Sequence, residues 1–216
     1  TRNSEPGTPV RLTPDVDSKL PRYYYSVFDH YLSPTWSPDG KQLILVSNRG
    51  SIWGSGGLWR MEARPGAPLI PVRDEETTWR ARPDWALDGR RVVYASYLGR
   101  QWHQLWLTTG DGGDPFQLTY GDFDATDPRW SPDGRRVAYI SNQGGNTALY
   151  LVEVPGGGRT KVEARKRIYR EPVGRLTIRV TDSLTGRPSP ARVSVTLADG
   201  RSAAPDDVWR HADDAF

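Results

Sequence analysis

Residues that could perform acid–base, metal or nucleophilic chemistry are few and scattered in this sequence. The chain has no Cys and three His, at His30, His103 and His211, and none lies in an H-x-H or H-E-x-x-H pattern. A G-x-S-x-G motif, which would present a nucleophilic Ser on a tight turn, is also absent. The sequence therefore predicts no catalytic residue, no metal site and no cofactor within the chain, and it leaves open whether the protein is an enzyme.

Two acidic stretches are the alternatives for binding a cation. "GDFDATD" offers Asp122, Asp124 and Asp127 together, and "HADD" at 211–214 offers His211 beside two carboxylates. A cation site needs several oxygens that converge on one point. The other interpretation, which the spacing favours, is that both stretches are polar loops, the first of them capping strand ends.

One short turn motif occurs three times. "WSPDG" stands at 36–40 and again at 130–134, and "WALDG" at 85–89 repeats it with Leu87 in place of Pro, so the spacings are 49 and 45 residues. Asp-Gly supplies the positive φ that a tight hairpin needs. We expect Asp39, Asp88 and Asp133 to accept hydrogen bonds within these turns. Ser37 and Ser131 are expected to be turn-forming rather than nucleophilic.

The segments around each turn predict a repeated four-stranded sheet. A strand precedes the turn, a short apolar run follows it, and two further strands complete each unit of about 45 residues. The apolar runs are "LILV" at 43–46, "VVYA" at 92–95 and "VAYI" at 137–140. One sheet alone cannot bury both of its faces, so neighbouring sheets must stack. We therefore expect an all-β fold of β-propeller blades, as four-stranded antiparallel sheets in an incomplete ring.

These residues also resemble a known family. The segments "PTWSPDGKQLILVSNRG", "PDWALDGRRVVYAS" and "PRWSPDGRRVAYISNQGGN" look like the WD40-like PD40 repeats of TolB-type propellers. The resemblance covers roughly residues 9–161, and it departs from the family pattern at Leu87 and at "APLIPV", which replaces the usual ending of the first unit. It implies a recognition or scaffold module, and an exported, periplasmic or secreted location.

The unit boundaries predict three parts. Residues 1–13 end in "TPVRLT", which matches "DPFQLT" at 114–119, and are interpreted as the last strand of a preceding blade. Residues 14–170 are assigned to three TolB-like blades. Because three blades are too few to close a ring, we expect either a longer parent protein or self-association of two copies.

Residues 171–216 are predicted to be a partial β-sandwich. "LTIRVTD" at 176–182 and "ARVSVTLADG" at 191–200 read as two strands around a turn, and they resemble carboxypeptidase-regulatory-like domains. Together with the blades, this segment is similar to the N-terminal part of metal-dependent hydrolases of the amidohydrolase type. The basic stretch at 159–175 is interpreted as a connector or outer strand rather than a nucleic-acid arm, since no aromatic platform accompanies it. No apolar run is long enough to span a membrane.

Aromatic and His side chains gather in segments predicted to lie at one end of the blades. Aromatic and charged side chains on loops are common in binding surfaces. The alternative is that these rings pack between blades or against another domain. The candidate binding residues are Tyr23, Tyr24, Tyr25, His30, Trp53, Trp79, Trp102 and His103.

Two functions follow from these patterns. The first is a non-catalytic propeller module that recognises a protein or peptide partner, or another domain of the same polypeptide, without nucleic acid. The alternative is the accessory propeller of a metal-dependent hydrolase whose catalytic domain lies outside this chain. Metal-ligand motifs downstream in the parent reading frame would favour the second.

Overall fold

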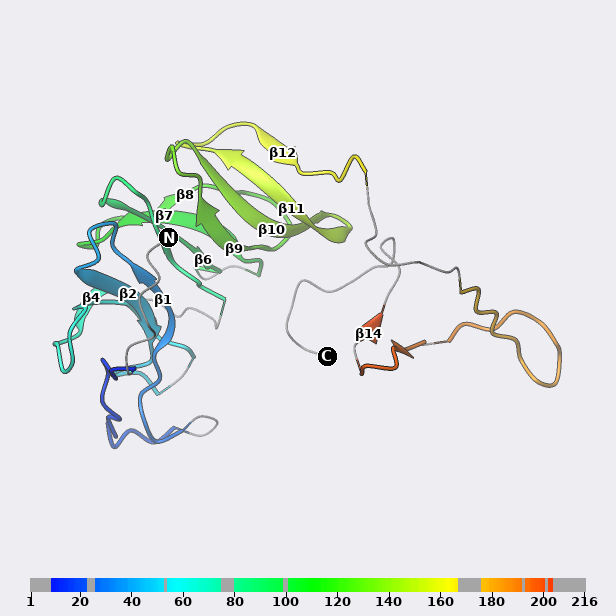
Figure 1. The fold of residues 1–216 in the computed structure, drawn as a ribbon, viewed down its shortest axis with the longest axis horizontal. Coiled ribbons are helices and arrows are strands. Elements are labelled where there is room, and N and C mark those ends of the chain that lie inside the picture. Colours follow the sequence, from blue (N-terminus) through cyan, green and yellow to red (C-terminus); the bar gives the residue numbers. More distant parts are fainter. Residues whose placement is uncertain are drawn as a thin grey trace. The chain divides into compact units, whose positions relative to one another are not determined.

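The computed structural model describes residues 9–22, 26–52, 54–74, 80–98, 101–166, 176–191, 193–200 and 202–203. They fall into two compact units, one ending at Val162 and the other beginning at Glu163. All regular structure in this part of the chain is β (Figure 1). Within the same residues, no helix is long and apolar enough to cross a membrane.

The first unit consists of three antiparallel sheets of four strands, each in simple sequence order. They appear in Figure 1 in blue to cyan, green, and green to yellow along the chain. This confirms the predicted three-fold repeat of four-stranded sheets, which we call blades 1 to 3. Blade 1 contains β1 (Leu32–Trp36), β2 (Gln42–Ser47), β3 (Gly57–Glu62) and β4 (Ile70–Arg73); blade 2 contains β5 (Asp84–Trp85), β6 (Arg91–Ser96), β7 (Gln104–Thr109) and β8 (Phe116–Gln117); blade 3 contains β9 (Ala125–Trp130), β10 (Arg136–Gly144), β11 (Asn146–Glu153) and β12 (Arg159–Lys161).

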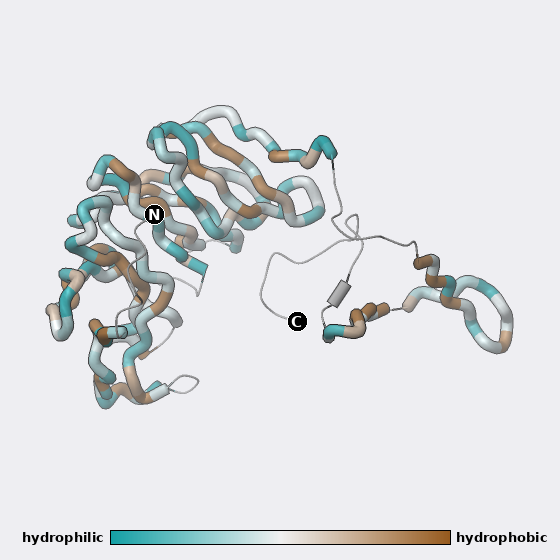
Figure 2. The backbone as a smooth tube through the Cα atoms, in the orientation of Figure 1, coloured by the Kyte–Doolittle hydropathy of each residue, from teal (hydrophilic) through white to brown (hydrophobic). Residues whose placement is uncertain are grey.

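The core lies between successive blades. The apolar runs of β2 and β6 are buried on both sides. Blade 2 lies between blades 1 and 3, whereas the face of β2 away from blade 2 is covered by residues that include Leu12 and Tyr31. Figure 2 shows these runs as brown segments along the strands. The cluster between blades 1 and 2 contains Val46, Leu58, Val72, Ala81, Tyr94 and Trp106; the cluster between blades 2 and 3 contains Val93, Ala95, Leu105, Leu107, Leu118, Ala125, Val137, Tyr139, Tyr150 and Val152.

The first strands of the three blades lie side by side. β1 contacts β5, and β5 contacts β9. Each is an edge strand of its own sheet, so these three strands form the inner side of the blade array. The blades are therefore packed with their first strands toward one common edge, as in a propeller.

The first repeated turn is held by its own side chains. Asp39 Oδ1 accepts hydrogen bonds from Ser37 Oγ at 2.7 Å and from the Lys41 N–H at 3.1 Å. Gly40 has a φ of 70°, the conformation for which Gly is required. The Ser37 hydroxyl also accepts the Gln42 N–H at 2.9 Å, so it serves the turn, as the sequence predicts.

The other two turns use the same Asp. In blade 3, Asp133 Oδ1 accepts from Ser131 Oγ at 2.6 Å and from the Arg135 N–H at 3.0 Å. In blade 2, where Ala replaces Ser, Asp88 Oδ1 accepts from the N–H groups of Arg90 and Arg91 at 2.8 and 3.0 Å. The predicted turn role of the three Asp residues is confirmed.

The segment before β1 is not a regular strand. The described residues 9–13 form no ladder, but Leu12 packs against Leu43, Leu45 and Met61 of blade 1. The Leu12 carbonyl also accepts the Gly66 N–H at 3.0 Å. The assignment of residues 1–13 to a preceding blade stays a prediction.

The second unit has little regular structure. Its described strands are β13 (Val195–Thr196) and β14 (Ser202–Ala203), with an isolated bridge between Thr181 and Pro188. The long strand expected over 176–182 is therefore reduced to that bridge, and Leu176 and Leu184 are largely exposed. A short hairpin with no covered apolar face gains little from strand pairing alone. The sandwich assignment for this unit stays a prediction.

Candidate functional site

The candidate residues that the structure describes, His30, Trp102 and His103, belong to the ends of the blades opposite the Asp-Gly turns. In an antiparallel sheet, the connection after the second strand and the connection to the next sheet leave from the same end. We call this end the loop-rich face, and its described residues are 26–31, 48–52, 54–56, 97–98, 101–103 and 118–124. Hydrogen bonds join the segment before β1 to the β2–β3 connection, and the start of blade 3 to the β6–β7 connection.

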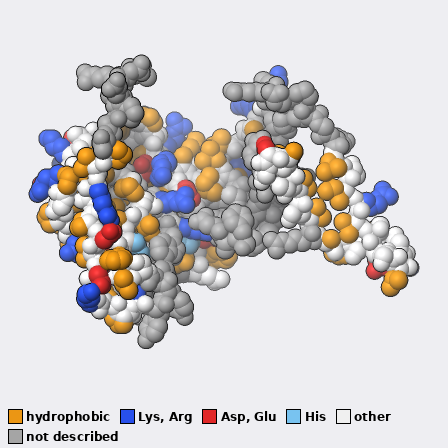
Figure 3. Space-filling view, turned by 60° about the horizontal axis from the view of Figure 1, so that its bottom comes forward, with side chains coloured by type: hydrophobic (Ala, Val, Ile, Leu, Met, Phe, Trp, Pro, Cys, Tyr) orange, Lys and Arg blue, Asp and Glu red, His pale blue; other side chains and the backbone are white. Residues whose placement is uncertain are grey.

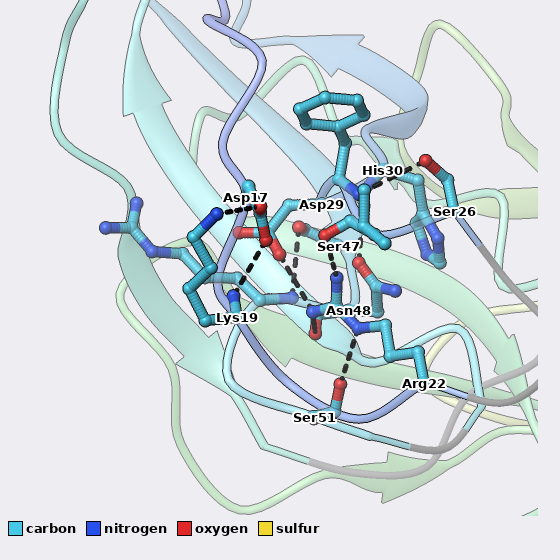
Figure 4. A network of polar contacts seen from close by, with 12 residues as sticks. Asp17, Lys19, Arg22, Ser26, Asp29, His30, Ser47, Asn48 and Ser51 are labelled. Carbon is cyan, nitrogen blue, oxygen red and sulfur yellow. Dashed lines mark hydrogen bonds and ion pairs between the residues drawn. The ribbon is translucent and has the colours of Figure 1, made fainter.

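A buried ion pair anchors the segment that precedes β1. Arg22 Nη2 lies 2.8 Å from Asp29 Oδ1, and the two side chains are 1% and 0% exposed. Arg22 also donates to two carbonyls of the β2–β3 connection, from Nη2 to Asn48 at 2.9 Å and from Nε to Ser51 at 3.0 Å (Figure 4). One guanidinium therefore fixes two loops of blade 1 to each other.

His30 lies beside this ion pair. Its Nε2 donates to the Ser55 carbonyl at 2.9 Å, and its backbone N–H donates to Asn48 Oδ1 at 3.0 Å. Burial lowers the pKa of the imidazole below its ordinary value, and the hydrogen bond to Ser55 only partly opposes this shift. His30 is thus a neutral, half-buried part of the loop framework near pH 7.

His103 forms a second polar cluster, between blades 2 and 3. Its Nδ1 and its backbone N–H both lie 3.1 Å from Asp124 Oδ1, and its ring is 4.1 Å from the Tyr97 ring, centroid to centroid. Burial raises the pKa of the Asp124 carboxyl, but the hydrogen bonds from His103 outweigh burial, so the net pKa is lowered. The Ala125 N–H donates to the His103 carbonyl at 2.9 Å, which joins the two blades.

Three of the eight predicted binding residues can be placed. His30 and His103 lie in the two separate clusters, and Trp102 is half-buried next to His103 in the chain. The structure does not bring the two His together. The other five, Tyr23, Tyr24, Tyr25, Trp53 and Trp79, lie outside the described residues.

The acidic stretch at 121–127 does not form a cation site. Asp124 is bound to His103, while Asp127 forms an ion pair with Arg82. In the part of the chain that the structure describes, no group of three or more His, Asp or Glu is placed to hold a metal ion. The stretch caps strand ends, as the alternative interpretation of the sequence had it. The "HADD" stretch lies outside the described residues.

Comparison with known proteins decides the fold. TolB from Acinetobacter baumannii matches with a TM-score of 0.51 at 19% identity, covering 63% of this chain and 33% of that chain. The three sheets are blades of a TolB-like β-propeller. A puromycin hydrolase mutant matches with a TM-score of 0.50 at 18% identity, covering 80% of this chain and 32% of that chain. No protein-family model and no curated protein sequence matches the chain.

The chain spans about a third of the length of these two structures. At such low identity the likeness shows the propeller fold alone. Function must therefore be argued from the residues of this propeller.

Two Asn residues that contribute hydrogen bonds to these clusters were not predicted from the sequence. Asn48 Oδ1 accepts the His30 N–H, and Asn142 Oδ1 accepts the Asp124 N–H at 2.9 Å in the equivalent position of blade 3. The signal was present, since "SN" follows the apolar run of the second strand in both blades. In blade 2 Tyr97 replaces Asn and packs on His103 instead.

The chemistry of the loop-rich face is therefore that of a positioned surface. Its buried charges are paired, its His30 side chain bonds a backbone carbonyl, and its Asn side chains cap N–H groups. Hydrogen-bonded networks of this kind favour one loop conformation. The arrangement can present side chains to a partner, and in the described residues it contains no nucleophile with an adjacent base.

Proposed function

We propose that this propeller is a non-catalytic module that recognises a protein or peptide partner through its loop-rich face. The observation that carries this proposal is the buried Arg22–Asp29 network, which rigidly positions the loops that flank the aromatic segment 23–25. Loops that are ordered before binding lose less conformational entropy when a partner docks. Trp102, half-buried beside the second cluster, supplies a further aromatic contact.

The proposal is tested by removing aromatic side chains from the loop-rich face. The triple substitution Tyr24→Ala, Trp79→Ala and Trp102→Ala is expected to abolish partner capture from an extract of the source cells. Thermal unfolding should change little. The matched control is Leu87→Ala, an exposed side chain in the Asp-Gly turn of blade 2, at the opposite end of the sheet. Capture that survives the triple substitution, or that is lost equally in the control, contradicts the proposal.

A second candidate is the accessory propeller of a hydrolase whose catalytic domain lies elsewhere. It is supported by the likeness to the puromycin hydrolase structure, which covers 80% of this chain. Under this proposal the 216-residue chain alone cleaves no peptide or amide substrate, and it binds a separately produced hydrolase domain encoded in the same reading frame. Absence of such binding would favour the recognition module.

A periplasmic or secreted location is proposed from the likeness to TolB. Fractionation of source cells with an antibody to the blades tests it. Recovery of the protein with cytoplasmic markers would contradict it.

A further inference from the structure

The inner strands of the three blades share a strained motif. A Pro-x-Trp sequence lies in or immediately before each of them, and the residue before each Pro has a positive φ: 47° at Ser33, 35° at Arg82 and 54° at Asp127. Non-Gly residues rarely adopt this conformation, and it is concentrated at functional sites. In β1 and β9 the strand register also shifts at this position. Such bulges redirect side chains out of the regular ladder.

The residue after each Pro shows what is unusual about blade 3. In blade 1 this residue is Thr35, whose Oγ1 accepts the backbone N–H of Trp85 in the next blade at 3.4 Å. In blade 2 it is Asp84, whose Oδ2 accepts the backbone N–H of Trp130 at 2.7 Å. In blade 3 it is Arg129, and a guanidinium has no acceptor for such a bond. Blade 3 therefore presents a cation where the other blades present an acceptor.

Arg129 lines a hollow along these inner strands. The hollow has a volume of about 420 Å³ and also exposes Ser33, Thr35 and Trp36 of β1, with Arg82 and Asp84 of blade 2. We call it the inner-strand pocket. The Trp36 side chain is 56% exposed, whereas Trp85 at the equivalent position of blade 2 is 8% exposed. The pocket thus combines an accessible indole with an accessible guanidinium.

The carboxylate that lines the pocket, Asp84, already accepts the backbone N–H of Trp130. Arg82, which also lines the pocket, forms an ion pair with Asp127. In its hydrogen bonds Arg129 uses only Nη1, which donates to the Pro128 carbonyl at 2.7 Å and weakly to the Arg82 carbonyl at 3.5 Å, while its charge also attracts the Asp84 carboxylate. Its Nε and Nη2 donors have no protein acceptor among the described residues. Figure 3 shows Lys and Arg side chains at separate places on the viewed face.

We propose that the inner-strand pocket binds a peptide carboxylate, either a C-terminal carboxylate or that of a Glu or Asp side chain. The Nε and Nη2 donors of Arg129 match the two oxygens of a carboxylate. The exposed face of Trp36 packs against the neighbouring apolar side chain of the peptide, and the Ser33 hydroxyl donates a hydrogen bond. This inference rests on the proposed recognition function, but it uses a surface different from the loop-rich face.

Isothermal titration calorimetry on the full chain tests the inference with three peptides. They are acetyl-Gly-Gly-Ala-Leu with a free carboxylate, the same peptide as its amide, and acetyl-Gly-Glu-Ala-Leu as its amide. At least one of the two carboxylate peptides is expected to bind tenfold or more tightly than the uncharged amide, and which one binds identifies the source of the carboxylate. Equal affinity of all three peptides, or no binding, overturns the proposal.

Variants assign the binding to Arg129. Arg129→Gln should weaken binding of the favoured carboxylate peptide about tenfold or more and leave the affinity for the amide peptide unchanged. The control Arg135→Gln replaces an exposed Arg on the blade 3 turn and should not change the affinity for any peptide. Arg129→Lys, which keeps the charge but loses the fork, should weaken it severalfold, and it decides the question if Arg129→Gln does not fold. The proposal is overturned if neither Arg129→Lys nor Trp36→Leu changes the affinity for the carboxylate peptide. It is also overturned if Arg135→Gln lowers that affinity as much as the Arg129 variants do.

The test is separable from that of the proposed function. Tetrapeptide binding needs no cellular partner and no residue of the loop-rich face. Tetrapeptide binding with partner capture unaffected by the triple substitution would contradict the loop-rich face proposal and support the inner-strand pocket. The reverse result would contradict only the pocket.

Discussion

At the scale of single residues, the loop-rich face depends on the buried ion pair between Arg22 and Asp29 Oδ1, whereas Asp29 Oδ2 has no hydrogen-bond partner among the described residues. Arg22 contacts Asp29 and two carbonyls, and the residues it joins are as far as 29 positions apart in the chain. A charge removed from water is tolerated only when its partner and hydrogen bonds are present. The pairing could not be predicted from the sequence, because nothing local distinguishes Arg22 from the other Arg residues.

Replacing Arg22 by Met should strongly destabilise the first unit. The substitution leaves Asp29 buried without its partner, for which the expected cost is about 3–5 kcal/mol in the free energy of unfolding. Urea denaturation followed by Trp fluorescence measures it. Arg11→Met is the control, since Arg11 forms an exposed pair with Asp15, and it should leave the midpoint unchanged. Equal midpoints for the two variants would show that the buried pair is not an anchor.

His30 should make stability depend on pH. Burial lowers its folded-state pKa, so protons bind the unfolded chain more readily, beginning near the ordinary value of about 6.5. The contribution of His30 is therefore complete above that pH and is lost as the pH falls toward the lowered folded-state pKa. His30→Gln should flatten the fall in unfolding free energy between pH 7 and pH 5. An unchanged slope in this variant would show that other groups cause it.

At the scale of elements, the sequence was sufficient for the repeated strands and turns. The "WSPDG" motif and the apolar run after it identify β1–β2, β5–β6 and β9–β10, because local turn chemistry and burial on both faces act within a few residues. The positive φ of the residue before Pro34, Pro83 and Pro128, and the register shifts that accompany it in β1 and β9, were not predicted. A residue before Pro normally adopts an extended conformation, so the sequence gives no local signal for a positive φ there.

The hydrogen bond between blades 2 and 3 should be measurable. Asp84→Ala removes the acceptor of the half-buried backbone N–H of Trp130 and should cost about 1–3 kcal/mol in unfolding free energy. Asp84→Asn keeps an oxygen acceptor and should retain most of the stability. Thr35→Val should cost less than Asp84→Ala, because its bond of 3.4 Å is longer. Chemical denaturation of the three variants gives the order, and the reverse order would contradict a bridging role for Asp84.

At the scale of the whole molecule, the exposed faces of the blades are not equivalent. Leu105 of blade 2 is fully buried against blade 3, whereas Leu149 at the equivalent position of blade 3 is 41% exposed. Self-association of two copies through this face stays a prediction.

The candidate site was only partly predictable, since His30 and His103 lie on the predicted face but in separate clusters that depend on contacts between distant loops.

Site-specific photo-crosslinking is the most direct test of the claim that the loop-rich face is the recognition surface. A benzophenone amino acid is placed at Trp102 on that face, or at Leu87 in the turn at the opposite end of the same blade, and the protein is irradiated in source cells. The account predicts a covalent adduct with a partner from position 102 and none from position 87. An adduct from position 87 alone, equal adducts from both positions, or no adduct from position 102 would contradict it.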